Sequence, residues 1–465
     1  MSVLKKLGLT KKQLVMITVF TFAAFVGILN QTLLSPALPS IMKELGIDAA
    51  TAQWLTTAFT MVNAIMIPVT AFLIDRYTTR ALFTFSSVVF ALGSLMAAVS
   101  TNFPLLLGGR ILQAMGAGIM MPMLQVVMLI MIKREYRGMV MGVFGLIICF
   151  APMIGPTVAG IIVDQYNWHI LFWIIAPLML LICLLGLATL ENVGERKDVS
   201  LDKLSVILST MGFGGLLYGF SAIGSYGIHA TALLVIAVGA VSLVFFFRRQ
   251  LAIANPMLQV RVLKNRQFLT GTIITMIVQA AMMVASVIVP IYIQTVRGYS
   301  ATVSGLMMLP GAIVSGIAGL AAGKIFDEKG PRGLAISGAA LLCIGSTAFV
   351  FLTDSTPIWY LCVMFMVRSL GMSFLNMPLN TWALNALDNN IIAHGTALGN
   401  TFRQVSGSLG TAVLITVMSI VSSANADELG ANEAMLFGID VTFGVAAVLS
   451  FICLVLSIWK VKDKK

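Results

Sequence analysis

Long stretches without a single charged side chain dominate this sequence. Residues 49–74 contain no Asp, Glu, Lys or Arg over 26 positions, and residues 204–247 contain none over 44 positions. A helix needs about 20 mostly apolar residues to cross a bilayer. The whole chain is 59% hydrophobic and 10% charged, whereas a soluble domain carries about 25% charged residues. Because so few charges cannot cover a water-facing surface, the sequence indicates an integral membrane protein.

The apolar runs number fourteen. Residues 204–247 are long enough for two helices, with a turn at "GSYGIHA" (224–230). The sequence shows no long strand-like alternation, so we expect an all-α membrane fold and not a β-barrel. The first run is too long for a signal peptide and is expected to be a retained span. The predicted spans are residues 13–39, 52–74, 81–100, 104–132, 138–163, 168–190, 204–225, 230–247, 268–293, 302–323, 333–353, 356–386, 395–420 and 436–459.

The basic residues predict the orientation of these spans. If the N-terminus is cytoplasmic, 24 of the 29 Lys and Arg residues fall in cytoplasmic segments, two in outer loops and three within spans. This bias fits the positive-inside rule and predicts a multi-pass protein of the plasma (inner) membrane with both termini in the cytoplasm. The net charge of +11 thus reflects topology, and no nucleic acid partner is expected. The longest outer connection, residues 422–434, is expected to be a solvated acidic loop.

The sequence also contains an internal repeat. Three pairs of segments are similar at offsets of 252, 258 and 257 residues: 71–80 with 323–332, 108–116 with 366–373, and 137–144 with 394–401. Such repeats are typical of transporters built from two related bundles. We therefore expect spans 1–6 and 9–14 to form two six-helix bundles, with spans 7 and 8 inserted between them. The predicted divisions are residues 1–190, 191–250 (a cytoplasmic loop and the inserted helices) and 251–465.

Several motifs carry a family resemblance. These are "LIDRYTTR" (73–80) between spans 2 and 3, "LLLGGRILQAMGAG" (105–118) in span 4, "CFAPMIGPTVAG" (149–160) in span 5, "LNQTLLSPALP" (29–39) in span 1 and "NWHILFWI" (167–174) in span 6. Together they resemble the major facilitator superfamily, in its fourteen-span drug:proton antiporter branch. The wording of spans 4–7, such as "FAPMIGPT" and "STMGFGGLLYGFS", is closest to lincomycin-resistance-type multidrug efflux permeases.

The resemblance implies a proton-coupled exporter of amphipathic drugs that works by alternating access. It implies a monomer in a lipid bilayer, with no cofactor and the proton gradient as its energy source. Export of one native metabolite or lipid remains an alternative. An enzyme is not expected, since the chain has no HExxH motif and "GLAAGKI" (319–325) lacks the Ser or Thr of a P-loop. The cysteines form no CxxC pair, so no metal site is expected.

Arg110 is the first candidate for a functional residue. A charge within a span is costly and is usually functional or internally paired. Gln113, Ala114 and Ala117 follow at i+3, i+4 and i+7, so they share its helix face. This face could line a polar cavity, or it could serve tight helix packing. The resemblance implies that Arg110 takes part in coupling protons to substrate.

Other intramembrane polar residues suggest where a substrate binds. Arg403 has Asn400 at i−3, and Asn376 and Asn380 form an i, i+4 pair. Because unpaired polar groups are costly in hydrocarbon, these side chains should face the bundle interior, as cavity lining or as interhelical contacts. Flexible methionines suit an adaptable binding surface. The predicted cavity residues are Asn30, Gln31, Gln113, Ala114, Gln279, Met283, Arg368, Asn376, Asn380, Asn400 and Arg403.

Two further motifs predict moving parts. The turn with Asp75, Arg76 and Arg80 and its second copy with Asp327 and Arg332 are expected to form a cytoplasmic gate. We expect Asp75 and Arg80 to latch it when the cytoplasmic side is closed, and which copy holds the latch stays open. The antiporter motif, with a helix-bending proline, is expected at a close contact between the two halves. Its residues are Gly155, Pro156, Ala159 and Gly160.

The position of the proton carrier is a departure from the family pattern. The family commonly has aspartate in span 1 where this chain has Asn30, and an amide does not titrate. A proton carrier in a membrane is normally a carboxylate with a raised pKa. The candidates are Asp440 and Asp164, with Arg110 modulating them. Asp440 could equally be a helix-end carboxylate that reaches toward water.

Overall fold

The computed structural model describes residues 10–193, 202–253, 256–299 and 301–463. Almost all of these residues are helical, and the described parts contain no strand. Within the helices, the side chains of Pro156 and Asp164 lie outside the described set. The predicted roles of these two residues therefore stay predictions.

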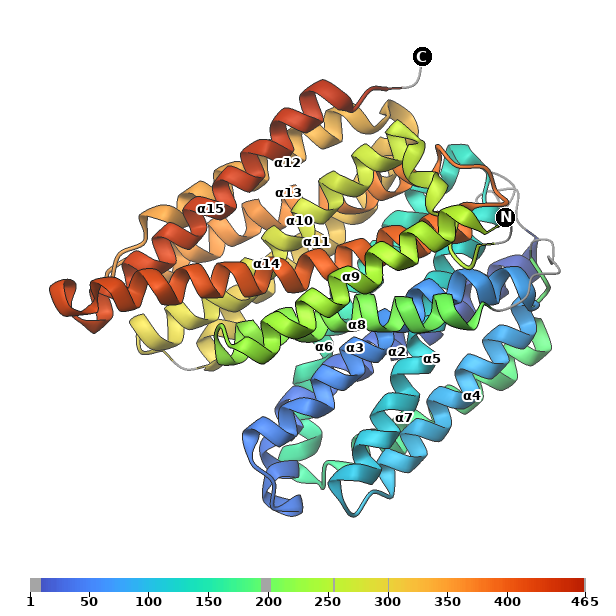
Figure 1. Ribbon diagram of the computed structural model, residues 1–465, viewed down its shortest axis with the longest axis horizontal. Helices are drawn as coiled ribbons and strands as arrows, with labels where there is room; N and C mark the ends of the chain where they lie inside the picture. Colours follow the sequence, from blue (N-terminus) through green and yellow to red (C-terminus); the bar gives the residue numbers. More distant parts are fainter. Residues whose placement is uncertain (1–9, 194–201, 254–255, 300, 464–465) are drawn as a thin grey trace.

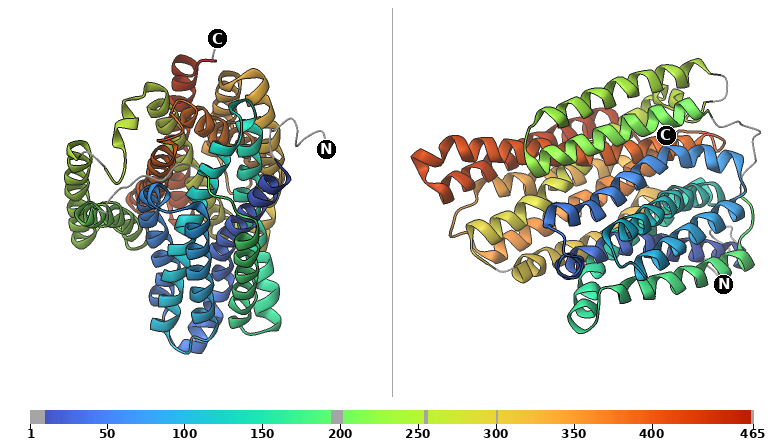
Figure 2. Two further views of the ribbon diagram at one scale, coloured as in Figure 1. Left: turned by 90° about the vertical axis from the view of Figure 1, so that its right-hand side faces the viewer. Right: turned by 60° about the horizontal axis from the view of Figure 1, so that its bottom comes forward.

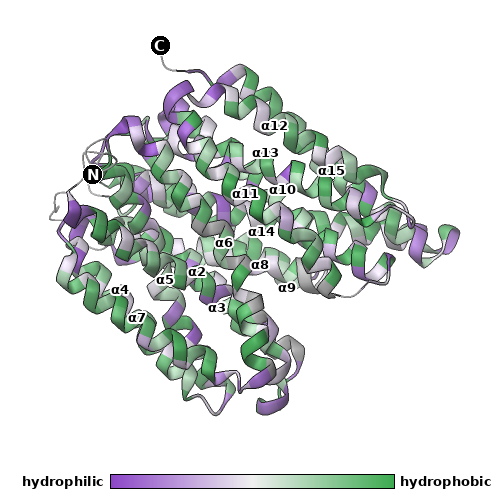
Figure 3. Ribbon diagram, turned by 180° about the vertical axis from the view of Figure 1, so that it is seen from behind, coloured by the Kyte–Doolittle hydropathy of each residue, from purple (hydrophilic) through white to green (hydrophobic). Residues whose placement is uncertain are grey.

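Fourteen long α-helices make up the described structure, and thirteen of them are apolar enough to cross a membrane by length and composition. The remaining one, α6, has 29 residues and lies among them. Apolar residues dominate the ribbons (Figure 3), so the expected all-α membrane fold is confirmed. The helices are α2 Lys11–Leu45, α3 Ala49–Arg76, α4 Thr79–Ala98, α5 Phe103–Met131, α6 Arg137–Gln165, α7 His169–Thr189, α8 Lys203–Tyr226, α9 Ala230–Ala252, α10 Arg266–Ile291, α11 Ala301–Lys329, α12 Pro331–Ala348, α13 Ile358–Leu384, α14 Ile392–Leu429 and α15 Ala431–Lys460.

Polar residues mark where several of these helices begin. Asp48 Oδ1 accepts a hydrogen bond from Thr51 N at 2.8 Å, and Asn102 Oδ1 accepts one from Leu105 N at 3.0 Å. Thr10 forms a capping box with Gln13 at the start of α2. Backbone groups at a helix end need such partners because the hydrocarbon supplies none. These caps therefore fix where α2, α3 and α5 begin.

The helices form two groups that meet at one end of the molecule. We call α2–α7 the N half and α10–α15 the C half. Figure 1 shows them close together at the end that carries both termini, and diverging toward the opposite end. Contacts between the halves are made by α6 with α11 and α13, and by α14 with α3 and α5. We call the two ends the termini face and the far face.

The two inserted helices lie beside this pair of halves (Figure 2). They pack against each other, and α8 also contacts α3 of the N half and α14 of the C half. At the termini face Arg249 Nε donates to Asp202 Oδ2 at 2.6 Å. Hydrogen bonding by the Arg249 guanidinium lowers the pKa of Asp202 to about 2. The bond between α9 and the start of α8 therefore persists throughout the physiological pH range.

The acidic segment at 422–434 is a correction to the sequence prediction. It is helical except for Gly430, because α14 continues to Leu429 and α15 starts at Ala431. Gly430 has a φ of 80°, a left-handed conformation that glycine adopts at no steric cost. The expected solvated loop is thus a helical hairpin at the far face.

The contact between α6 and α11 is built on glycines. A Cβ added to Gly138 would lie 2.7 Å from Gly323 O, and one added to Gly142 would lie 2.7 Å from Gly319 O. The helices can approach this closely only because those positions lack side chains. The halves therefore meet at the start of α6, at the termini face.

The antiporter motif lies elsewhere on α6, which corrects its expected place between the halves. A Cβ on Gly155 would collide with the Thr32 side chain of α2, in the same half. Nothing lies within 4 Å of a Cβ on Gly160, and Ala159 is buried. At Gly155 the motif therefore packs α6 against α2 of the N half.

We expect Gly142→Ala to destabilise the protein and Gly160→Ala to leave it unchanged or slightly more stable. The added methyl at 142 meets backbone, and such overpacking costs about 1–3 kcal/mol. At 160 the methyl enters open space and raises helix propensity. Thermal unfolding of the two purified variants checks this. Equal unfolding temperatures would contradict the proposed tight α6–α11 contact.

Candidate functional site

A cavity of about 360 Å³ lies between the two halves. Its wall includes side chains from α2, α3, α5 and α6 of the N half and from α10, α11, α13 and α14 of the C half. Six of the predicted cavity residues take part: Gln31, Gln279, Met283, Asn376, Asn400 and Arg403. Their polar and thioether groups can contact an amphipathic molecule of small size.

A hydrogen bond across this cavity joins the halves. Asn400 Nδ2 of α14 donates to Gln125 Oε1 of α5 at 3.1 Å, and Arg403 Nη2 donates to Asn400 Oδ1. Gln125 was not among the predicted site residues. The sequence could have predicted it, because Gln125 lies on the same face of α5 as Gln113 and Ala117, at i+4 spacing.

Arg110 lies away from the cavity, inside the N half. Its side chain is fully buried; Nη1 donates to Gln113 Oε1 at 2.9 Å and to Asn30 O at 3.3 Å, and Nε donates to Leu55 O at 3.4 Å. The guanidinium also lies 4.3 Å from the Phe59 ring centroid. The expectation that this face lines a polar cavity is therefore wrong for Arg110 in this arrangement.

The neighbours of Arg110 share this network. Gln113 Nε2 donates to Ser94 Oγ at 2.8 Å, and Asn30 Nδ2 donates to Gln113 Oε1 at 3.0 Å. Ala114 is fully buried. Asn30, Gln113 and Ala114 are absent from the described cavity wall, so these three cavity assignments are also corrected. The polar groups of α2, α4 and α5 instead hold the N half together.

The C half buries its own arginine in a similar way. Arg368 is fully buried, and its Nη2 donates to Ala281 O of α10. Asn380 is buried too, and neither residue is among those described in the cavity wall. Asp440 lies on α15, half-buried, with an Oδ1 atom that has no hydrogen-bond partner. It is likewise not among the described residues lining the cavity, so Arg403 is the predicted charged residue that reaches it.

At the termini face, the second copy of the gating turn bridges the halves. Asp327, near the end of α11, accepts hydrogen bonds from Gly138 N at 2.8 Å and Met139 N at 2.7 Å. These amides lie in the first turn of α6, where unpaired N–H groups and the helix dipole favour a negative charge. The carboxylate therefore caps a helix of the other half.

The first copy also bridges the halves, through a histidine. Asp75 Oδ2 lies 3.0 Å from His394 Nε2, at the start of α14. His394 Nδ1 accepts a hydrogen bond from Gln259 N at 3.3 Å, in the segment that joins α9 to α10. Because Nδ1 is an acceptor, Nε2 carries the proton and donates to Asp75. His394 was missed, although the repeat aligns it with Arg137 at the start of α6.

The basic residues of the gate are placed differently from the prediction. Arg80 donates to Leu187 O in its own half, and Arg332 N donates to Asp463 Oδ1 at 3.0 Å. Arg76 ends α3 and is exposed. The expectation that Arg80 joins Asp75 in the latch is therefore wrong. Arg137 does bridge the halves, with Nη1 3.0 Å from Asn385 Oδ1.

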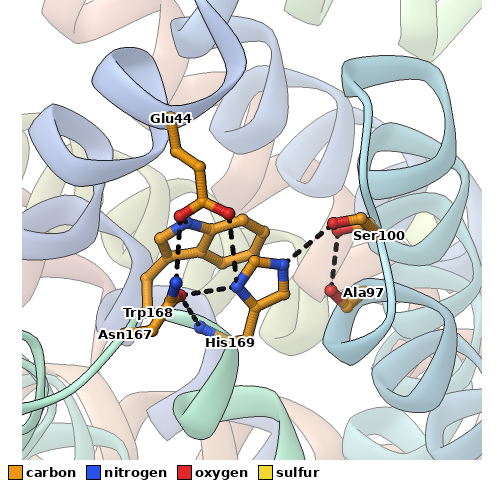
Figure 4. A network of polar contacts seen from close by, with 6 residues as sticks. All are labelled: Glu44, Ala97, Ser100, Asn167, Trp168 and His169. Atoms are coloured by element: carbon orange, nitrogen blue, oxygen red, sulfur yellow. Dashed lines mark hydrogen bonds and ion pairs between the residues drawn. The ribbon is translucent and has the colours of Figure 1, made fainter.

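The far face of the N half has a separate polar network (Figure 4). Glu44 Oε2 accepts from Trp168 Nε1 at 2.9 Å and from Asn167 Nδ2 at 3.0 Å, which ties α2 to the start of α7. His169 Nε2 lies 2.9 Å from Ser100 O, beyond the end of α4. These bonds hold the outer ends of three helices together, so the N half is tied at both ends.

Comparisons with known proteins identify the family. Residues 20–411 match the family model of the Major Facilitator Superfamily. The chain is 45% identical, over 95% of its length and 94% of the relative's, to the uncharacterized MFS-type transporter YcnB of Bacillus subtilis (strain 168). It is 36% identical to the lincomycin resistance protein LmrB of the same organism, over 93% and 92% of the two chains.

A solved structure supports the fold. The human organic anion transporter MFSD10 (TETRAN) superposes with a TM-score of 0.66, covering 95% of this chain and all of that one, at 13% identity. That likeness bears on the fold alone. The chain belongs to the major facilitator superfamily, so it is a multi-pass membrane transporter and not an enzyme.

We expect Asp327→Asn to open the termini face more than Asp75→Asn does. At position 327 the Asn side chain has one acceptor oxygen and no charge, whereas the carboxylate accepts from two amides of α6. At position 75 the oxygen of an Asn side chain can still accept the single hydrogen bond from His394. The measurement is labelling of a cysteine placed at Gln404 by an impermeant thiol reagent from the termini side, in a variant without native cysteines. Glu328→Gln is the matched control, and equal labelling of Asp327→Asn and this control would contradict the latch.

We expect His394→Leu to lower the unfolding temperature of the purified protein. Removing a hydrogen-bond partner from a buried carboxylate costs about 1–3 kcal/mol, and the anchor for the α9–α10 segment is lost as well. His394→Gln should recover part of the loss, because its amide can still donate to Asp75. Equal unfolding temperatures of both variants and the parent protein would show that His394 does not stabilise the contact between the halves.

Proposed function

We propose that the protein exports amphipathic small molecules from the cytoplasm by alternating access, driven by proton entry. The observation that carries this proposal is a cavity shared by two halves that are latched together at the termini face by Asp327 and Asp75. A substrate bound between such halves can be released on one side and then the other as they rock. The relatives named for lincomycin resistance support drug export.

The orientation follows from the charges. The Lys and Arg bias predicts that the termini face is cytoplasmic. With that face closed and the halves diverging toward the far face, the arrangement is the outward-facing one.

The divisions 1–190, 191–250 and 251–465, and function as a monomer, remain part of the proposal.

Proton coupling is proposed to use a carboxylate within a helix. Asp440 is half-buried within α15, and its unpaired Oδ1 is a site where a proton can be held. Asp164 is the second candidate. Asn30 bonds Gln113 and cannot titrate, so the Arg110 network acts on coupling by positioning helices.

A second candidate is export of one compact native metabolite or lipid, with no need for proton coupling. The cavity volume of about 360 Å³ lies at the lower end of the roughly 300–1,000 Å³ that ligand pockets span, so it suits a compact ligand best. Drug efflux would then be incidental.

The test is efflux of two fluorescent amphipathic dyes, one anionic and one neutral, from cells that make the protein, with and without a protonophore. We expect efflux that collapses with the protonophore and falls about tenfold or more in Asp440→Asn, as for loss of a general proton carrier. Asp427→Asn, an exposed carboxylate at the end of α14, is the control. Efflux at an unchanged rate in the presence of the protonophore would contradict coupling to proton entry. If neither compound is exported, export of a single native metabolite is favoured instead.

A further inference from the structure

The charges of the cavity wall are one-sided. Among the described residues that line it, Arg403 is the charged one, and none is an aspartate or glutamate. The rest of the wall combines amides, such as Gln31 and Asn376, with apolar side chains, such as Met121 and Phe144. An organic cation entering this cavity would meet a guanidinium and no described carboxylate.

Arg403 is incompletely paired. Its Nη2 donates to Asn400 Oδ1, but its Nη1 is buried and has no hydrogen-bond partner. No described carboxylate forms an ion pair with it. A buried charge left in this condition is costly, and an opposite charge nearby lowers that cost.

The other two intramembrane arginines do not share this placement. Arg110 and Arg368 also keep buried nitrogens without a partner, but Arg110 makes three hydrogen bonds inside the N half, and Arg368 bonds Ala281 O inside the C half. Arg403 instead lies in the wall between the halves, where a ligand can supply the missing partner once the side chain turns toward it. The Asn400–Gln125 bond beside it crosses between the halves, so a ligand that engages Arg403 also touches the contact that opening must break.

We infer that the substrates are amphipathic organic anions, whose carboxylate or sulfonate pairs with Arg403 while the apolar part rests on the methionine and phenylalanine side of the wall. This inference rests on the proposed export function and names its substrate class. The guanidinium fork matches a carboxylate in charge and geometry. The inside-negative membrane potential also favours outward movement of a negative charge.

The test compares three dyes of one scaffold: a carboxylate, its neutral methyl ester and a cationic amine derivative. Binding to the purified full-length protein in detergent is followed by dye fluorescence, and export is measured in cells. We expect the carboxylate to bind tightest, and Arg403→Gln to weaken its binding about tenfold or more, as for loss of a charge-assisted hydrogen bond. The methyl ester should change little.

Two variants separate the charge from other effects. Arg403→Lys keeps the charge and should retain part of the carboxylate affinity, whereas Lys324→Gln removes an exposed charge at the termini face and should change nothing. Tightest binding of the cation, or equal weakening of all three dyes by Arg403→Gln, would overturn the inference. Selective carboxylate binding without any export would support the inference and contradict the proposed function.

Discussion

The closed termini face depends on one carboxylate placed at a helix start. Asp327 accepts from two amides in the first turn of α6, so a carboxylate of the C half satisfies backbone donors of the N half. Those amides have no partner within their own helix. The glycine contact of α6 with α11 brings the carboxylate within reach, and the cavity lies between the same two halves.

The internal repeat uses the same principle twice with different chemistry. Asp75 is hydrogen-bonded to the side chain of His394 near the start of α14, whereas Asp327 accepts hydrogen bonds from backbone amides near the start of α6. The histidine adds a link that the other copy lacks, because Gln259 of the α9–α10 segment bonds to its second nitrogen. The inserted helices are therefore connected to the gate as well as packed against α3 and α14.

The sequence was sufficient for the fold and for part of the site. Uncharged apolar runs place the spans, since the bilayer imposes their length and polarity. Periodicity does not say which neighbour a polar face meets. Arg110 and Arg403 look alike as intramembrane arginines, yet the first is enclosed by its own half and the second lies in the cavity wall. That difference arises from long-range packing. The acidic segment at 422–434 was predicted wrongly for a similar reason, because composition does not distinguish a solvated loop from an exposed helical hairpin.

The central claim is that export requires the latched termini face to open. It is tested by cysteines at Arg134 and Asp388, exposed residues of opposite halves; Arg134 Nη2 lies 3.5 Å from Leu387 O. In a variant without native cysteines, a short cleavable thiol cross-linker would join them. The account predicts that cross-linked protein stops exporting dye and recovers when the linker is reduced. Unchanged export by the cross-linked protein would contradict it.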